Sequence, residues 1–120
     1  MRGLTILLAG PDADRLRSAL GLAAAQAALG GAARLFLDGA AVALLAPPLA
    51  APDDAAHAAA GLPTLAELVD TACTLGVSVT LCQSGLALAG LDATTIDARF
   101  ATGGLTGLLA TIGEDRLVAL

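Results

Sequence analysis

The chain alternates between short apolar runs and longer segments in which apolar residues recur at helical spacing. Residues 4–8 form a short apolar run, which is typical of a strand covered on both faces. Residues 33–37 predict a second strand, and residues 77–82 alternate β-branched residues with others before ending at a cysteine. Two further strands are predicted, near residues 99–102 and over residues 116–120.

The helical segments carry start and stop signals. Asp12 is the predicted N-cap of a helix over residues 14–29, and the pair Gly30-Gly31 ends it. Thr64 and Glu67 form a capping box that starts the next long helix. Three shorter helical segments are predicted, over residues 40–45, over residues 84–89 with Ser84 as N-cap, and over residues 105–112.

Strands that alternate with helices predict an α/β fold, with a five-stranded, mainly parallel sheet between two helical layers. A chain of 120 residues is one ordinary domain, residues 1–120, in which roughly two-thirds of the unfolded surface can be buried. Apolar residues make up 57% of the chain, but no apolar run reaches the ~20 residues of a membrane span. The N-terminus lacks a cleavage pattern, so two free cysteines in a reducing, cytoplasmic compartment are expected.

The charge excludes several ligand classes. The net charge is −5, and the six basic residues are scattered arginines, so neither the nucleic-acid backbone nor a membrane surface is an expected partner. There is no Trp or Tyr to stack on bases, and no lysine for phosphate or Schiff-base chemistry. The glycines do not form a nucleotide fingerprint, and the cysteines lack zinc spacing. We therefore expect no cofactor and no metal.

The carboxyl ends of parallel strands are where an open α/β sheet binds ligands. Cys82 is the one strong nucleophile predicted at that edge. A short helix follows it, and the unpaired amides at a helix start favour a thiolate, which is the reactive form of cysteine. The alternative is that Cys82 packs at the strand end, since cysteine is among the residue types most often buried.

Other residues are secondary candidates. Cys73 lies on the apolar stripe of its helix and is expected to be inert. His57 lies in an Ala/Pro-rich segment, residues 46–62, where prolines argue against regular structure and predict a mobile lid or a loop ordered by a neighbour. His57 is a candidate base for Cys82 if that segment folds over the edge, and otherwise a solvent-exposed residue. The remaining candidates at the edge are Gly10, Asp12, Asp38, Gln83, Ser84, Gly85 and Gly103, with a turn or cap role as the alternative for Asp38.

Residues 7–45 and 63–98 resemble the DsrE/DsrF-like family of small α/β proteins. The second strand of the first stretch ends in Phe36-Leu37-Asp38-Gly39. The second stretch contains Leu-Gly-Val before its strand and Cys82-Gln83-Ser84 after it, so that the segment from Cys82 to Leu91 is its most specific part. The resemblance implies a flavodoxin-like, three-layer fold and assembly into dimers, trimers or hexamers. For the sulfur-relay branch it also implies a persulfide on Cys82.

Two functions therefore compete. In the first, Cys82 carries a persulfide and passes sulfur between a donor and an acceptor protein. In the second, the protein is a non-catalytic oligomeric scaffold or a small-ligand-binding module.

Overall fold

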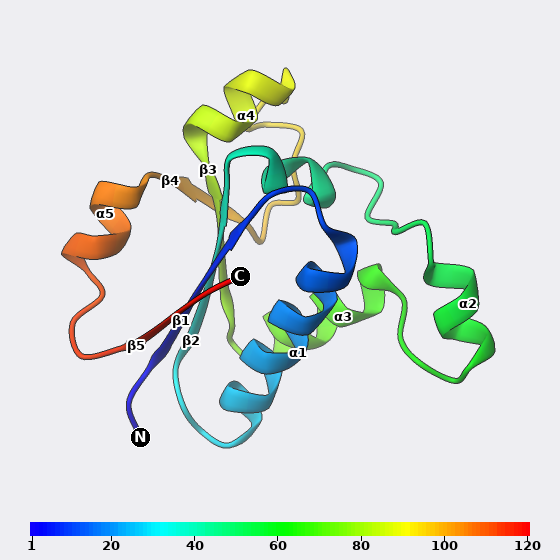
Figure 1. Ribbon diagram of the computed structural model, residues 1–120, viewed down its shortest axis with the longest axis horizontal. Helices are drawn as coiled ribbons and strands as arrows, with labels where there is room; N and C mark the ends of the chain where they lie inside the picture. The colour runs from blue at the N-terminus through cyan, green and yellow to red at the C-terminus, as the bar shows by residue number, and fades with distance from the viewer.

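Five parallel strands form a single sheet in this computed structural model, which describes residues 1–120 (Figure 1). The strands lie in the order β4-β3-β2-β1-β5, and every neighbouring pair is parallel. Their bounds are β1 Leu4–Ala9, β2 Ala33–Asp38, β3 Ser78–Cys82, β4 Ala101–Gly103 and β5 Arg116–Ala119. The predicted five-stranded, parallel, flavodoxin-like α/β fold is confirmed.

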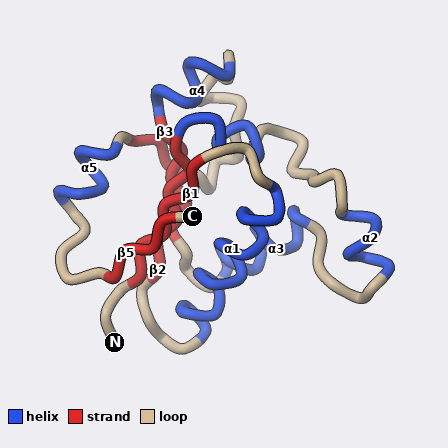
Figure 2. The backbone as a smooth tube through the Cα atoms, viewed as in Figure 1, coloured by secondary structure: helices blue, strands red, loops and turns tan.

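The helices occupy both faces and the carboxyl edge of the sheet (Figure 2). The chain moves in one direction across the sheet from β1 to β4 and then returns to place β5 beside β1. Right-handed crossovers consequently put the helices that connect β1 to β2 and β2 to β3 on one face of the sheet, and the helix that connects β4 to β5 on the other face. The helical elements are α1 Ala13–Ala28, the 3-10 helix η1 Gly39–Leu45, α2 Asp54–Ala59, α3 Leu65–Thr74, α4 Gln83–Ala89 and α5 Leu105–Ala110.

The first sheet face holds the core. Leu4, Ile6 and Leu8 of β1 point to the same side because alternate residues of a strand share a face, and all three are buried. Leu35 of β2 pairs in register with Ile6 and is buried with them. Helices α1 and α3 cover this side, and α1 contributes the buried residues Leu16, Ala19, Leu20 and Ala23.

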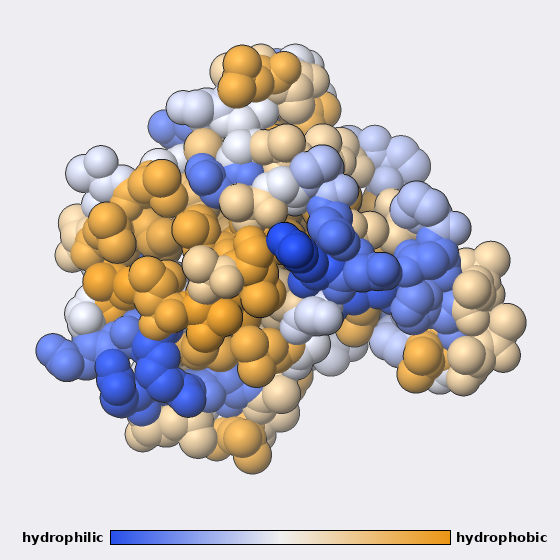
Figure 3. Space-filling model, in the orientation of Figure 1, coloured by the Kyte–Doolittle hydropathy of each residue, from blue (hydrophilic) through white to orange (hydrophobic).

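The second sheet face is covered far less completely. Its third layer is α5, a six-residue helix with no buried residue. Leu105 and Leu109 of α5 and Leu117 of β5 are exposed, and Figure 3 shows a hydrophobic area around α5 and β5. We call these three leucines the α5–β5 patch. One layer of the sandwich is therefore thin, and its apolar side chains contact solvent.

Segment 46–62 differs from the prediction. The prolines were expected to prevent regular structure, yet α2 forms within it, because residues 53–62 contain no proline. Arg17 of α1 holds the segment in place: its side chain is only 9% exposed and forms ion pairs with Asp53 and Asp54. Arg17 Nη1 also donates to the carbonyl of Pro63 at 2.8 Å. The segment is thus fixed by its own chain.

Asp54 is the centre of this attachment. Its Oδ2 accepts from the Ala51 amide and its Oδ1 from the Leu65 amide, each at 2.9 Å. These two amides, followed by Arg17, lower the pKa of Asp54 below its ordinary value of 3.8. Since the folded-state pKa is depressed, the stabilisation is present well above pH 3.8 and is lost as the pH falls below it.

Asp54→Asn should therefore be less stable than the wild type at neutral pH, and the difference should shrink on acidification below 3.8. Urea unfolding of both proteins across this range measures the difference. A difference in unfolding free energy between the two proteins that does not change with pH would contradict this role of the Asp54 carboxylate.

Most predicted elements are observed with ends shifted by a few residues. Thr64 forms the complete capping box with Glu67, and Gly90 ends α4 in the left-handed conformation, as expected. The predicted N-cap Ser84 is wrong: β3 passes directly into α4, Cys82 occupies the N-cap position, and Ser84 lies in the first turn. None of the helices is both long and apolar enough to span a bilayer.

Candidate functional site

The carboxyl ends of the strands bring the predicted edge residues together. Ala9 pairs in register with Asp38, and Cys82 pairs with Gly103. Leu81 of β3 pairs with Leu37 of β2. The next residue of each strand, Cys82 and Asp38, therefore lies at the same edge. Four sequence segments predicted to share an edge therefore do so.

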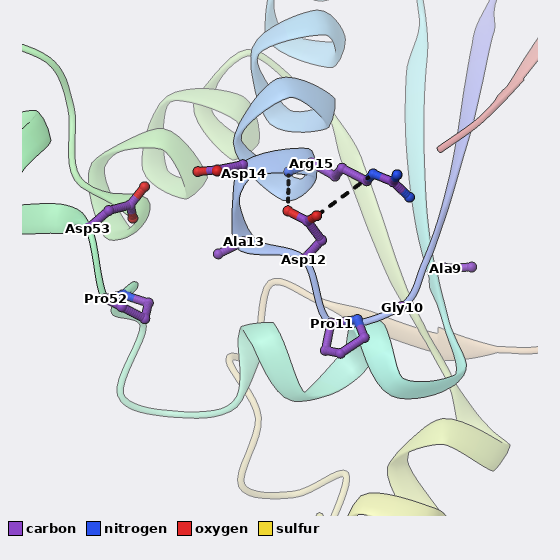
Figure 4. A pocket seen from close by; sticks show the side chains of 9 residues that line it. All are labelled: Ala9, Gly10, Pro11, Asp12, Ala13, Asp14, Arg15, Pro52 and Asp53. Atoms are coloured by element: carbon purple, nitrogen blue, oxygen red, sulfur yellow. Dashed lines mark hydrogen bonds and ion pairs between the residues drawn. The ribbon is translucent and has the colours of Figure 1, made fainter.

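The largest hollow at this edge lies beside the end of β1 (Figure 4). Its volume is about 680 Å³, and it is open to solvent. The predicted residues Gly10 and Asp12 line it, and Pro52 and Asp53 of the attached segment form its far side. It lies next to the point where β5 returns beside β1, which is where this class of sheet commonly binds ligands.

The charge of this hollow is mainly negative. Asp12, Asp14 and Asp53 line it together with a single arginine, Arg15. Asp12 is already engaged, because its Oδ1 accepts from the Arg15 amide at 3.1 Å as the N-cap of α1 (Figure 4). Carboxylates repel phosphate groups, so this edge does not suit a nucleotide. The carboxylates also do not gather into a group that could hold a metal ion.

Cys82 lies at the end of β3 and is 7% exposed. It belongs to the apolar core, and its side chain makes no capping hydrogen bond to α4. Gln83 and Ser84, which follow it, are exposed. The position at the strand end is as predicted, but the burial of Cys82 favours the packing alternative over a freely accessible thiol.

Gly85 is the point at which α4 approaches η1 most closely. A Cβ atom at Gly85 would lie 2.5 Å from the Gly39 carbonyl oxygen and 3.0 Å from Val42 Cγ1. The role of Gly85 is therefore close packing of two backbones. Asp38, directly before Gly39, occupies the N-cap position of η1 without a side-chain capping bond.

His57 does not face Cys82 within one chain. Its Nδ1 lies 2.9 Å from the carbonyl oxygen and 3.4 Å from Oδ2 of Asp53, which is the N-cap residue of the same helix. Helix α2 and helix α4 lie at separate ends of the molecule (Figure 1). Any pairing of His57 with Cys82 would need a second chain.

Cys73 has the properties of an unreactive thiol. It is half-buried on α3 and packs against the core. Burial, together with the carboxylates of Asp97 and Asp70, raises the pKa of Cys73, and the nearby Arg99 offsets this only in part. The thiolate is therefore scarce at neutral pH.

Sequence reasoning missed two arginines with specific partners. Arg17 holds the Ala/Pro-rich segment, and Arg34 lies on the second sheet face with Thr5, Thr111 and Asp115. A charged residue inside the otherwise apolar run of β2 was the available signal for Arg34. No local pattern indicated the partners of Arg17, which are 36 and 37 positions away in the sequence.

Comparison with solved structures identifies the fold. The ychN protein from E. coli superposes with a TM-score of 0.80 at 19% sequence identity, and all of both chains is covered. Protein MTH1491 from Methanobacterium thermoautotrophicum superposes with a TM-score of 0.69 at 12% sequence identity, and all of both chains is again covered. Protein BT1422 from Bacteroides thetaiotaomicron superposes with a TM-score of 0.68 at 18% sequence identity, and the match covers 98% of this chain and 94% of that protein. The chain shares their fold.

These identities establish architecture only. MTH1491 and BT1422 are described as proteins of unknown function. No protein-family model matches the chain, and neither does any curated protein.

Proposed function

We propose that this protein is a non-catalytic, self-assembling module of the DsrE/DsrF-like type. The fold shared with ychN and the sequence stretch from Cys82 to Leu91 support the family assignment. The assembly is supported by one observation above all: α5 has no fully buried residue, and of its residues only Leu108 packs against the core of its own chain.

A helix of six residues is not stable on its own. Nucleation is unfavourable, and helices in proteins are held mainly by packing of an apolar face. Here Leu105 and Leu109 of α5 are exposed beside Leu117 of the neighbouring β5. A second copy that covers the α5–β5 patch supplies the missing packing and removes apolar surface from water.

Sedimentation velocity of the full chain tests this proposal. The expected mass is that of a dimer, trimer or hexamer of the 11.6 kDa chain. A mass of one chain at every concentration, up to those at which weak dimers form, would remove it.

A second candidate function is a sulfur carrier, and the position of Cys82 at the carboxyl end of β3 supports it, although the thiol is buried in the single chain and would have to become exposed first. The Cys82 thiolate would attack the outer sulfur of a donor persulfide. A new S–S bond forms, the donor S–S bond breaks, and the donor leaves as a thiolate that takes up a proton.

Incubation with a low-molecular-weight persulfide followed by intact-mass measurement should add the mass of one sulfur atom. We expect the gain to vanish in Cys82→Ala and to persist in Cys73→Ala, because burial keeps the Cys73 thiol protonated. Wild-type protein that gains no sulfur, or that gains it on Cys73, would exclude the carrier function.

A further inference from the structure

A second hollow lies on the thinly covered face of the sheet, between β2, β3, β4 and α5. Its volume is about 240 Å³. We call it the Arg34 hollow. Six of the residues that line it matter below: Arg34, Phe36, Thr80, Gly104, Gly107 and Leu108.

Arg34 brings a positive charge to this face. Its Nε donates to Thr5 Oγ1 at 3.2 Å and lies 3.6 Å from Asp115 Oδ2, and its Nη1 donates to Thr111 Oγ1 at 2.8 Å. Nη2, however, is covered from solvent and has no hydrogen-bond partner. A covered donor without an acceptor destabilises the folded chain, and a charged donor does so more strongly than a neutral one. The guanidinium thus has one donor without a partner, and Arg34 is one of the residues that line the hollow.

Two glycines keep the hollow open. A Cβ atom at Gly104 or Gly107 would meet no other atom within 4 Å, and neither glycine has a positive φ. Neither packing nor backbone conformation therefore requires glycine at these positions. Gly107 also lies within α5, where glycine is a poorer helix former than alanine. Larger side chains here would occupy the space beside Arg34.

We propose that the Arg34 hollow binds a small monocarboxylic acid. One carboxylate oxygen accepts from Arg34 Nη2, the Thr80 hydroxyl supplies a further donor, and the hydrocarbon part lies against Phe36 and Leu108. Asp115 already balances much of the arginine charge, so a dianion such as phosphate is disfavoured. The volume corresponds to about eight water molecules, which suits an acid of a few carbons.

Binding needs a small movement. Because Nη2 is covered, a ligand oxygen reaches it only after the guanidinium turns toward the hollow. Only Leu108 of α5 packs against the core, so the helix resists such a movement weakly. Every group that this inference uses belongs to one chain.

Titration of ¹⁵N-labelled full-length protein with sodium butyrate, followed by NMR, tests the inference. We expect saturable shifts of the amide signals of residues 103–111. Arg34→Gln should weaken binding about ten-fold or more through loss of the charged donor. Gly107→Leu should abolish the shifts by filling the hollow. Gly21→Leu is the matched control, since Gly21 is also helical with open space around its Cβ position, and it should bind as the wild type does.

Three results would overturn the inference. These are an absence of saturable shifts in the wild type, equal affinity in Gly107→Leu, and equal shifts with sodium chloride or sodium phosphate at the same ionic strength. If Arg34→Gln fails to fold, the comparison of Gly107→Leu with Gly21→Leu still decides the question. The mass of the protein is measured separately, so a monomer that binds butyrate refutes the assembly and leaves the hollow as a site.

Discussion

Leu109→Glu is expected to convert the assembled protein to single chains. Leu109 is 58% exposed in one chain and belongs to the α5–β5 patch, so a second copy that covers the patch would bury the introduced carboxylate. An unpaired buried charge costs several kcal/mol, which corresponds to a weakening of association of roughly a hundred-fold or more. Sedimentation equilibrium against the wild type measures the change.

Leu88→Glu is the matched control for this variant. Leu88 is 88% exposed on α4, outside the α5–β5 patch, so the charge there should leave the mass unchanged. Dissociation caused by Leu88→Glu and not by Leu109→Glu would place the interface at the carboxyl edge instead. Because neither leucine belongs to the buried core, both variants should keep the cooperative urea unfolding transition of the sheet and α1.

Gly85→Ala should destabilise the fold by about 2 kcal/mol, although alanine is the better helix former. The added Cβ would lie 2.5 Å from the Gly39 carbonyl oxygen, so α4 and η1 must move apart. Gly21→Ala changes the same residue type in a helix with open space around it and should raise stability by up to ~1 kcal/mol. Urea unfolding of the two variants should therefore give changes of opposite sign.

If both alanine variants were more stable than the wild type, η1 would be able to move away from α4 without loss of stability. In that case Gly85 would have no packing role, and the close approach of α4 to η1 would not be a fixed feature of the carboxyl edge.

The elements with local signals could be predicted from the sequence. The N-cap Asp12, the capping box at Thr64 and the stop at Gly90 each satisfy backbone groups within a few residues, so the local chain determines them. The order of strands and helices then fixed the parallel sheet and the shared carboxyl edge. These predictions needed no knowledge of distant contacts.

The features that depend on distant contacts could not be predicted. Helix α2 is held by Arg17, and no pattern within residues 46–62 shows that attachment. The burial of Cys82 depends on how closely its neighbours pack in space, whereas its sequence position indicated only a strand end. Arg34 was overlooked because a single charged residue in a strand is compatible with a solvent-facing position. In each case a side chain from another element determines the outcome.

Hydrogen–deuterium exchange of the amides of α5 shows whether a second copy covers this helix. In the wild-type assembly, residues 105–110 should exchange slowly, and in Leu109→Glu they should exchange at nearly the rate of an unstructured peptide while β1 and β2 stay protected. Equal exchange of α5 in the two proteins, whether fast or slow, would show that no second copy covers the α5–β5 patch.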